Sequence, residues 1–237
     1  MSPVTSIILL SFFMIPNLAV ANTETELAKG KVVKQLSFPE DAEFGTVHIQ
    51  AVIDVPPQTV WKMLVHLEEW GQWMPSLTEG WFYSKEAMQH LPDPFPKDRN
   101  LSLELRKKYP GAEGAVNPFF VGEEVRMAYE NYDLLWPIRN EWVVRKYFYD
   151  SREAGLNKFK ASWAQVFNRN QKTEGYWLLE PFQNDPARTL LTYHYWVRAK
   201  AGLSRVVFKW GVQLFINRMM DHLKNEAEHQ KNQVSAL

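Results

Sequence analysis

The chain contains no cysteine among its 237 residues. This absence excludes a disulfide framework, a thiolate metal site and a lipid-modified cysteine. Basic and acidic residues number 27 each, so the formal net charge is zero and gives no electrostatic footprint for nucleic acid. The sequence also lacks an internal repeat, a phosphate-binding glycine loop and a nucleophile elbow. The sequence therefore gives no indication of the enzyme classes that these motifs identify.

A long hydrophobic run is missing as well. The apolar stretch over 6–15 is shorter than the roughly 20 residues that a membrane-spanning helix needs. It precedes Ala19-Val20-Ala21, a small-x-small pattern that is typical of a signal peptidase site. We therefore expect a signal peptide over 1–21, cleavage after Ala21, and a periplasmic or secreted protein. An uncleaved membrane anchor is the alternative.

Aromatic residues are abundant by contrast. Ten tryptophans accompany a hydrophobic content of 46%. Such a composition allows a sizeable core, and this many tryptophans indicate a wide aromatic-lined interior or an interaction surface. The length that follows the signal peptide suits one domain, which we place at 44–231 after an N-terminal arm at 22–43 and before a tail at 232–237.

Alternating apolar residues predict several strands. The segment 44–55 alternates clearly and ends at Pro56-Pro57, after which a helix is expected from about Gln58. A proline-rich insertion over about 84–120, with a short helix at 101–108, is either a lid or a solvated insertion. The polar segment 168–175 indicates a hairpin turn. Further strands are expected at 81–83, 123–129, 141–149, 158–167, 176–180 and 190–199.

A helical pattern follows Gly202 and continues to near Gln230. One apolar stripe should face the sheet, and a second side of the first turns is also apolar, so it needs a cover. The insertion, the N-terminal arm, or a membrane or partner are the three possible covers. The first stripe comprises Phe208, Val212, Phe215, Ile216, Met219 and Leu223, and the second comprises Leu203, Val206, Val207, Trp210 and Leu214.

The order of elements favours an α+β fold, in which a curved antiparallel sheet wraps around a long C-terminal helix and leaves a cavity between them. Three segments carry a resemblance to a known family: 60–64 leading to 70–75, then 136–145, and finally 189–193 with 200–202. In this order they resemble the START domains of the Bet v 1-like, helix-grip (SRPBCC) superfamily. Glu141 departs from the aspartate that is usual there.

The resemblance implies a hydrophobic cavity that holds one lipid or other apolar molecule. It places Trp142, Val144 and Lys146 inward, and strand alternation adds Phe159, Ala161, Trp163, Leu191, Tyr193 and Tyr195. The helix contributes Phe208, Val212, Phe215 and Met219. Arg139, Glu141 and Lys146 are the candidate polar anchors, although Glu141 is better explained by a structural ion pair. Tyr193 and Tyr195 either donate hydrogen bonds to a ligand or simply pack.

Catalytic and metal sites are not indicated. His48, His66 and His194 are isolated in sequence, and alternation places His48 and His194 on the outer face of their strands. His222, Glu226 and His229 share a helix face, but the polar surroundings favour a solvated surface over a metal site. We therefore expect no metal and no cofactor.

The favoured hypothesis is a carrier of a lipid or other hydrophobic small molecule, since a carrier needs only burial of apolar surface. A cyclase- or hydrolase-type enzyme that acts in the same cavity is the second hypothesis. The third is an interaction protein that docks on a membrane or partner through the first turns of the C-terminal helix.

Overall fold

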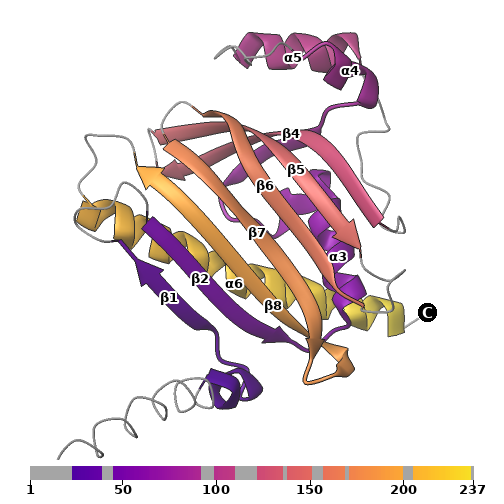
Figure 1. Cartoon of the computed structure of the whole chain (residues 1–237), viewed down its shortest axis with the longest axis vertical. Helices are drawn as coiled ribbons and strands as arrows, with labels where there is room; N and C mark the ends of the chain where they lie inside the picture. Colours follow the sequence, from indigo (N-terminus) through magenta and orange to yellow (C-terminus); the bar gives the residue numbers. More distant parts are fainter. Residues whose placement is uncertain are drawn as a thin grey trace, which may run out of the picture.

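A computed structural model gives the fold and describes residues 23–38, 45–91, 99–109, 122–135, 138–150, 157–168, 171–199 and 205–235. An eight-stranded antiparallel sheet has the order β1-β2-β8-β7-β6-β5-β4-β3. The long helix α6 lies behind this sheet in Figure 1, so we call the face toward α6 the inner face and the opposite one the outer face. This arrangement is the predicted helix-grip fold.

The strands are β1 (Val33–Ser37), β2 (Gly45–Ile53), β3 (Leu77–Phe82), β4 (Gly122–Leu135), β5 (Ile138–Asp150), β6 (Phe159–Asn168), β7 (Gln171–Phe182) and β8 (Asp185–Ala199). The helices are α3 (Pro57–Val65), the 3-10 helix η1 (Leu67–Gln72), α4 (Lys85–Gln89), α5 (Arg99–Lys108) and α6 (Arg205–Ser235). A helical turn over 23–28 precedes β1.

Helix α3 begins where the sequence predicts it. Pro57 occupies the first turn, where its missing N–H costs no hydrogen bond. Val60, Trp61 and Leu64 are fully buried, and the Trp61 ring lies 5.9 Å from that of Phe148 and 5.3 Å from that of Phe159. These contacts fix α3 against the inner face of β5 and β6.

Helix α6 buries the predicted stripe from Val212 onward, while the side chain of Phe208 lies outside what the structure describes. Ile216, Met219 and Leu223 are buried, and Val212 and Phe215 are half-buried against the same core. Met220 and Ala227 are also buried and were not part of the predicted stripe. The helix therefore closes the inner side of the sheet most tightly toward its C-terminal half.

The described part of the insertion does not cover α6. Helices α4 and α5 pack on the outer face of β3 and β4, where Trp81 stacks on Tyr129 with 4.1 Å between ring centroids. In Figure 1 they extend beyond the β3–β4 end of the sheet. Ala87 and Leu105 complete this second cluster. The described part of the insertion thus buries the outer side of β3 and β4, which would otherwise be exposed.

The N-terminal arm joins the sheet instead of lying outside it. Its segment Val33–Ser37 pairs with β2 as strand β1, and Lys34 Nζ donates to Asn217 Oδ1 of α6 at 2.5 Å. The arm still leaves Trp210 at 60% exposure, and Leu214 is half-buried. Of the second apolar side predicted for α6, Leu203 lies outside the described residues, as do the side chains of Val206 and Val207.

Several strands are longer than predicted, and β4 and β7 differ most. β4 continues past Tyr129 to Leu135, and β7 starts at Gln171, so the hairpin between β6 and β7 is much shorter than 168–175. In both strands a polar residue was taken to mark the end of the apolar alternation, whereas Glu130 and Thr173 are buried inside the sheet. The predicted signal peptide and the Trp136-Pro137 pair lie outside the described residues. Among the helices of the described ranges, none combines the length and the hydropathy that a membrane span requires.

Candidate ligand-binding interior

One row of paired residues crosses the inner face of the sheet. Lys146 pairs with Trp163, Trp163 with Gly175, and Gly175 with Tyr195. Side chains at directly paired positions of an antiparallel sheet lie on the same face. Three of the predicted site residues, Lys146, Trp163 and Tyr195, are therefore brought together although they belong to three different strands.

A buried ion pair stands at the β4–β5 end of this interior. Lys146 Nζ lies 2.5 Å from Glu130 Oε1, and both residues are at most 5% exposed. The hydroxyl of Tyr132 donates to Glu130 Oε2 at 3.1 Å. Burial lowers the pKa of Lys146, while the negative charge of Glu130 acts in the opposite direction. The carboxylate thus compensates the buried cation, and the pair has no net charge.

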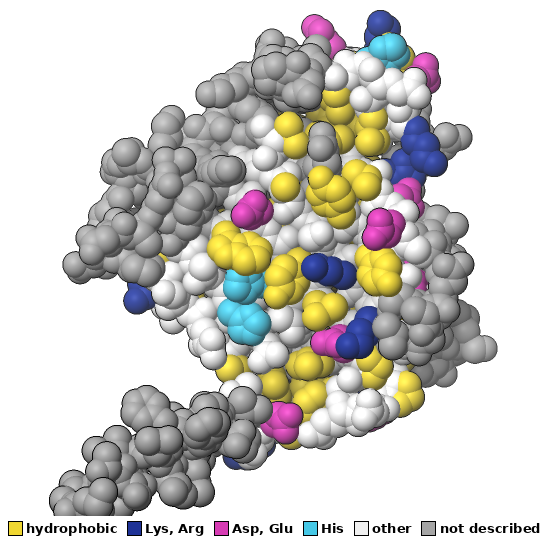
Figure 2. Space-filling view, in the orientation of Figure 1, with side chains coloured by type: hydrophobic (Ala, Val, Ile, Leu, Met, Phe, Trp, Pro, Cys, Tyr) yellow, Lys and Arg dark blue, Asp and Glu magenta, His cyan; other side chains and the backbone are white. Residues whose placement is uncertain are grey.

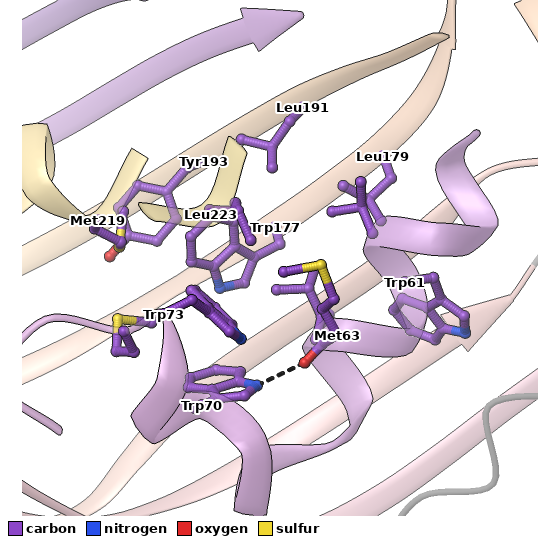
Figure 3. Packing of buried hydrophobic residues seen from close by; sticks show 14 of the residues in the cluster. Trp61, Met63, Trp70, Trp73, Trp177, Leu179, Leu191, Tyr193, Met219 and Leu223 are labelled. Carbon is purple, nitrogen blue, oxygen red and sulfur yellow. Dashed lines mark hydrogen bonds between the residues drawn. The ribbon is translucent and has the colours of Figure 1, made fainter. Parts of the chain in front are cut away.

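Trp70 holds the ammonium group from the other side. Lys146 Nζ lies 3.8 Å from the centroid of the Trp70 ring, which is a cation–π contact. The Trp70 Nε1–H donates to the Met63 carbonyl at 2.9 Å, and its ring centroid is 5.2 Å from that of Trp73 (Figure 3). This hydrogen bond fixes the orientation of the Trp70 ring, so that its face is directed at the ammonium group of Lys146.

Phenol groups extend this polar end into an aromatic wall. Tyr193 stacks on Trp163 at 5.7 Å and packs against Trp177 at 4.3 Å, and Tyr195 lies 6.1 Å from Tyr193. Burial raises the pKa of Tyr132, Tyr193 and Tyr195 above the usual value, and Glu130 adds to the rise for the first two. The phenols consequently stay protonated and act as hydrogen-bond donors at any physiological pH.

Helix α6 supplies the opposite wall. Phe215 contacts Tyr132 edge-on, with 6.3 Å between ring centroids, and Met219 is fully buried near Tyr193 (Figure 3). Val212 and Phe215 pack against the core but remain half-buried, as does Trp163 on the facing strand. These three residues are thus inward-facing apolar side chains that are only partly buried.

Gly175 makes room for Trp163. A Cβ atom at this position would overlap the His194 carbonyl oxygen and lie 2.6 Å from Cζ2 of Trp163. The indole therefore lies across a bare stretch of β7 backbone, which explains a glycine in the middle of a strand.

We expect Gly175→Ala to lower the free energy of unfolding by about 1–3 kcal/mol, because the backbone carbonyl on one side cannot move away. Chemical denaturation followed by far-UV circular dichroism measures this. Gly211→Ala on α6 is the matched control, since a Cβ there meets nothing within 4 Å, and helix propensity should stabilise that variant slightly. Equal stability of the two variants would contradict the proposed role of Gly175.

The other predicted site residues divide into two groups. Val144, Phe159, Ala161 and Leu191 are buried in the main core, as expected for inward positions. The side chains of Arg139, Glu141, Trp142 and Phe208 lie outside what the structure describes, so the ion pair predicted for Glu141 stays a prediction. The backbone pairs Arg139 with Asp133, Glu141 with Asn131, and Trp142 with Glu130.

Sequence reasoning missed Glu130, Tyr132, Trp70 and Trp177 as candidates for the site. Glu130 and Tyr132 are in phase with buried Ala128, so a predicted strand that continued from Tyr129 to Leu135 would have placed both inward. Among the described residues, no group of three or more histidine, cysteine, aspartate or glutamate side chains is arranged to hold a metal.

Comparison with known proteins agrees with the architecture. No family model and no curated protein sequence matches the chain. A STAR-related lipid transfer protein from Xanthomonas axonopodis has a TM-score of 0.55 at 12% identity, over 83% of this chain and 93% of that one. Human STARD10 has a TM-score of 0.54 at 11% identity, over 86% of this chain and 78% of that one. The Zhui aromatase/cyclase from Streptomyces sp. R1128 has a TM-score of 0.51 at 13% identity, over 79% and 95%. The chain therefore has the START-like helix-grip fold.

Proposed function

We propose that the protein binds one uncharged, largely apolar molecule between the sheet and α6 and carries it in the periplasm or outside the cell. The observation that carries this proposal is the polar end of the interior. Lys146, Glu130, Tyr132, Tyr193 and Tyr195 gather there beside half-buried apolar residues. Apolar walls with a few convergent polar groups are the usual make-up of a ligand site.

The charge balance of the interior indicates the kind of polar group that the ligand has. Among the described residues, the buried cations of the inner face are Lys146 and Arg126, and each has a carboxylate partner, Glu130 and Glu124 respectively. An anionic headgroup would bring one more negative charge to cations that are already neutralised, whereas a hydroxyl or carbonyl group needs only a phenol donor. The arrangement thus favours a sterol-, isoprenoid- or polyketide-like molecule over a phospholipid or a fatty acid.

A carrier role is favoured over catalysis. The three phenols have raised pKa values, and this makes them weak acids that cannot act as bases near neutral pH. The two solved structures named for lipid transfer and for aromatase/cyclase activity share the fold at 12% and 13% identity, so they support a cavity for an apolar molecule without choosing its identity. The sequence of 1–21 supports export.

Transient contact with a membrane during loading would fit the same proposal. Trp210 is 60% exposed near the start of α6, close in sequence to Val212 and Phe215 of the proposed site. Tryptophan is favoured at the level of lipid headgroups because one edge of its ring is polar. The exposed side of α6 is therefore the surface from which we propose that the ligand enters.

Native mass spectrometry of the protein purified from its host envelope tests the proposal. We expect an additional mass that corresponds to one neutral lipid, and binding of a sterol or isoprenoid alcohol in preference to a fatty acid of similar length. Tyr193→Phe should weaken binding by about 0.5–1.5 kcal/mol, the usual contribution of one hydrogen bond. Tyr147→Phe on the exposed outer face is the control. Failure of every apolar ligand to bind at micromolar concentration would refute the carrier.

A further inference from the structure

The outer face of the sheet carries a pair of histidines that the proposed carrier function does not use. His48 of β2 and His194 of β8 are directly paired in the register. Gln35 pairs with His48 on one side, and Tyr176 pairs with His194 on the other. Histidine side chains lie together on this face, among hydrophobic side chains, in Figure 2. Both imidazoles are half-buried, so solvent and solutes reach them.

The distance between the two Nδ1 atoms matches that between two histidine ligands of one metal ion. His48 Nδ1 and His194 Nδ1 are 3.3 Å apart. Two imidazole nitrogens at Zn–N distances of about 2.0–2.1 Å, separated by a tetrahedral angle, lie about 3.3–3.4 Å from each other. The separation of the two Nδ1 atoms is therefore that of two ligands of a single ion.

Neighbouring rings hold His194 in this orientation. Its ring centroid lies 4.0 Å from that of Trp196, and Tyr176 stacks on it at 5.5 Å with an interplanar angle of 12°. Partial burial lowers the pKa of both histidines, and the closeness of His48 lowers that of His194 further. Neutral imidazoles with a free lone pair are the form that binds a metal.

We propose that His48 and His194 form a surface site for a divalent transition metal ion of the Zn²⁺ type, bound through the two Nδ1 atoms. Two histidines leave further coordination positions to water or to the exposed side chain of Gln35. In the described part of the chain, His194 Nε2 is buried and has no hydrogen-bond partner. The outer-shell contact that strengthens most zinc sites is thus missing, and we expect affinity in the micromolar range.

The alternative is a plain hydrogen bond, in which one Nδ1–H donates to the other Nδ1. Titration calorimetry with ZnCl₂ on the mature, tag-free protein separates the two. We expect one equivalent of Zn²⁺ to bind, and His48→Gln and His194→Gln to weaken binding at least about tenfold, as loss of a direct ligand should exceed loss of an outer-shell contact. His222→Gln, which alters an exposed histidine of α6, should leave the affinity unchanged.

Thermal unfolding provides a second measurement that does not depend on the heat of binding. Saturating Zn²⁺ should raise the Tm of wild type and of His222→Gln, and should not raise the Tm of His48→Gln. The variants themselves should fold, since both histidines are only half-buried. The proposed site would be refuted if wild type bound no equivalent of Zn²⁺, or if His48→Gln and His194→Gln bound Zn²⁺ as tightly as wild type. Neither result would bear on the interior, which lies on the other face of the sheet.

Discussion

A Lys146→Met variant is expected to have a free energy of unfolding about 3–5 kcal/mol below that of wild type. Methionine fills a similar volume, so the loss does not come from a cavity. It comes from Glu130, which is 3% exposed and keeps only its hydrogen bond from Tyr132 once the ammonium group is gone. A buried carboxylate without a cation is among the most costly defects in a folded protein.

Urea denaturation at neutral pH measures this effect, and two further variants identify its cause. Lys146→Met combined with Glu130→Gln should recover most of the lost stability, because the amide can still accept from Tyr132 and has no charge to compensate. Lys107→Met removes a lysine from the exposed side of α5 and should change stability by less than about 0.5 kcal/mol. A double variant as unstable as the single one would show that Lys146 matters through packing and not through Glu130.

Comparison of Lys146→Met with the double variant Lys146→Met/Glu130→Gln also separates an effect on stability from an effect on ligand binding. Small domains have total stabilities of about 5–15 kcal/mol, so the single variant could be too unstable for a binding assay. The double variant removes both charges, and we expect it to keep the fold. If the ligand is uncharged, as we propose, the double variant should still bind it, because Tyr193 and Tyr195 are unchanged. If binding depends on an anionic headgroup, it should be lost.

The elements with strong local patterns were predictable from the sequence. Val47 and Ile49 alternate with His48, and the structure buries the first two while leaving His48 on the outer face. The stripe of Ile216, Met219 and Leu223 likewise predicted which side of α6 faces the sheet. In both cases the periodicity of apolar residues decides the structure, and a sequence shows that periodicity directly.

Features that depend on pairing between distant segments were not predictable in this way. Strand β1 is five residues long and has weak alternation, and it exists because β2 offers it an edge. From the sequence alone, a charged residue such as Glu130 predicts a position outside a strand. Its buried position in β4 is explained by its ion pair with Lys146. Gly175 likewise predicts a turn, and its place inside β7 is explained by the Trp163 side chain that lies over it. Each of these residues is explained by a neighbour from another strand.

Truncation of Trp70 has the second large expected effect. We expect Trp70→Ala to lower the free energy of unfolding by about 3–5 kcal/mol, the usual range for removing a buried aromatic side chain. The variant loses the contact with Trp73, the hydrogen bond to the Met63 carbonyl at 2.9 Å, and the cation–π contact with Lys146 at 3.8 Å. Trp210→Ala is the matched control, because Trp210 is 60% exposed and its truncation should cost less than about 0.5 kcal/mol.

Trp70→Phe distinguishes the parts of this effect. Phenylalanine retains an aromatic face for Lys146 but leaves the Met63 carbonyl without its donor, so its stability should fall between those of wild type and Trp70→Ala. A double-mutant cycle of Trp70→Ala with Lys146→Met then isolates the cation–π term, which is worth about 2 kcal/mol when both partners are desolvated. Strict additivity in this cycle would show that Trp70 only fills space, and that Glu130 alone holds the lysine in the interior.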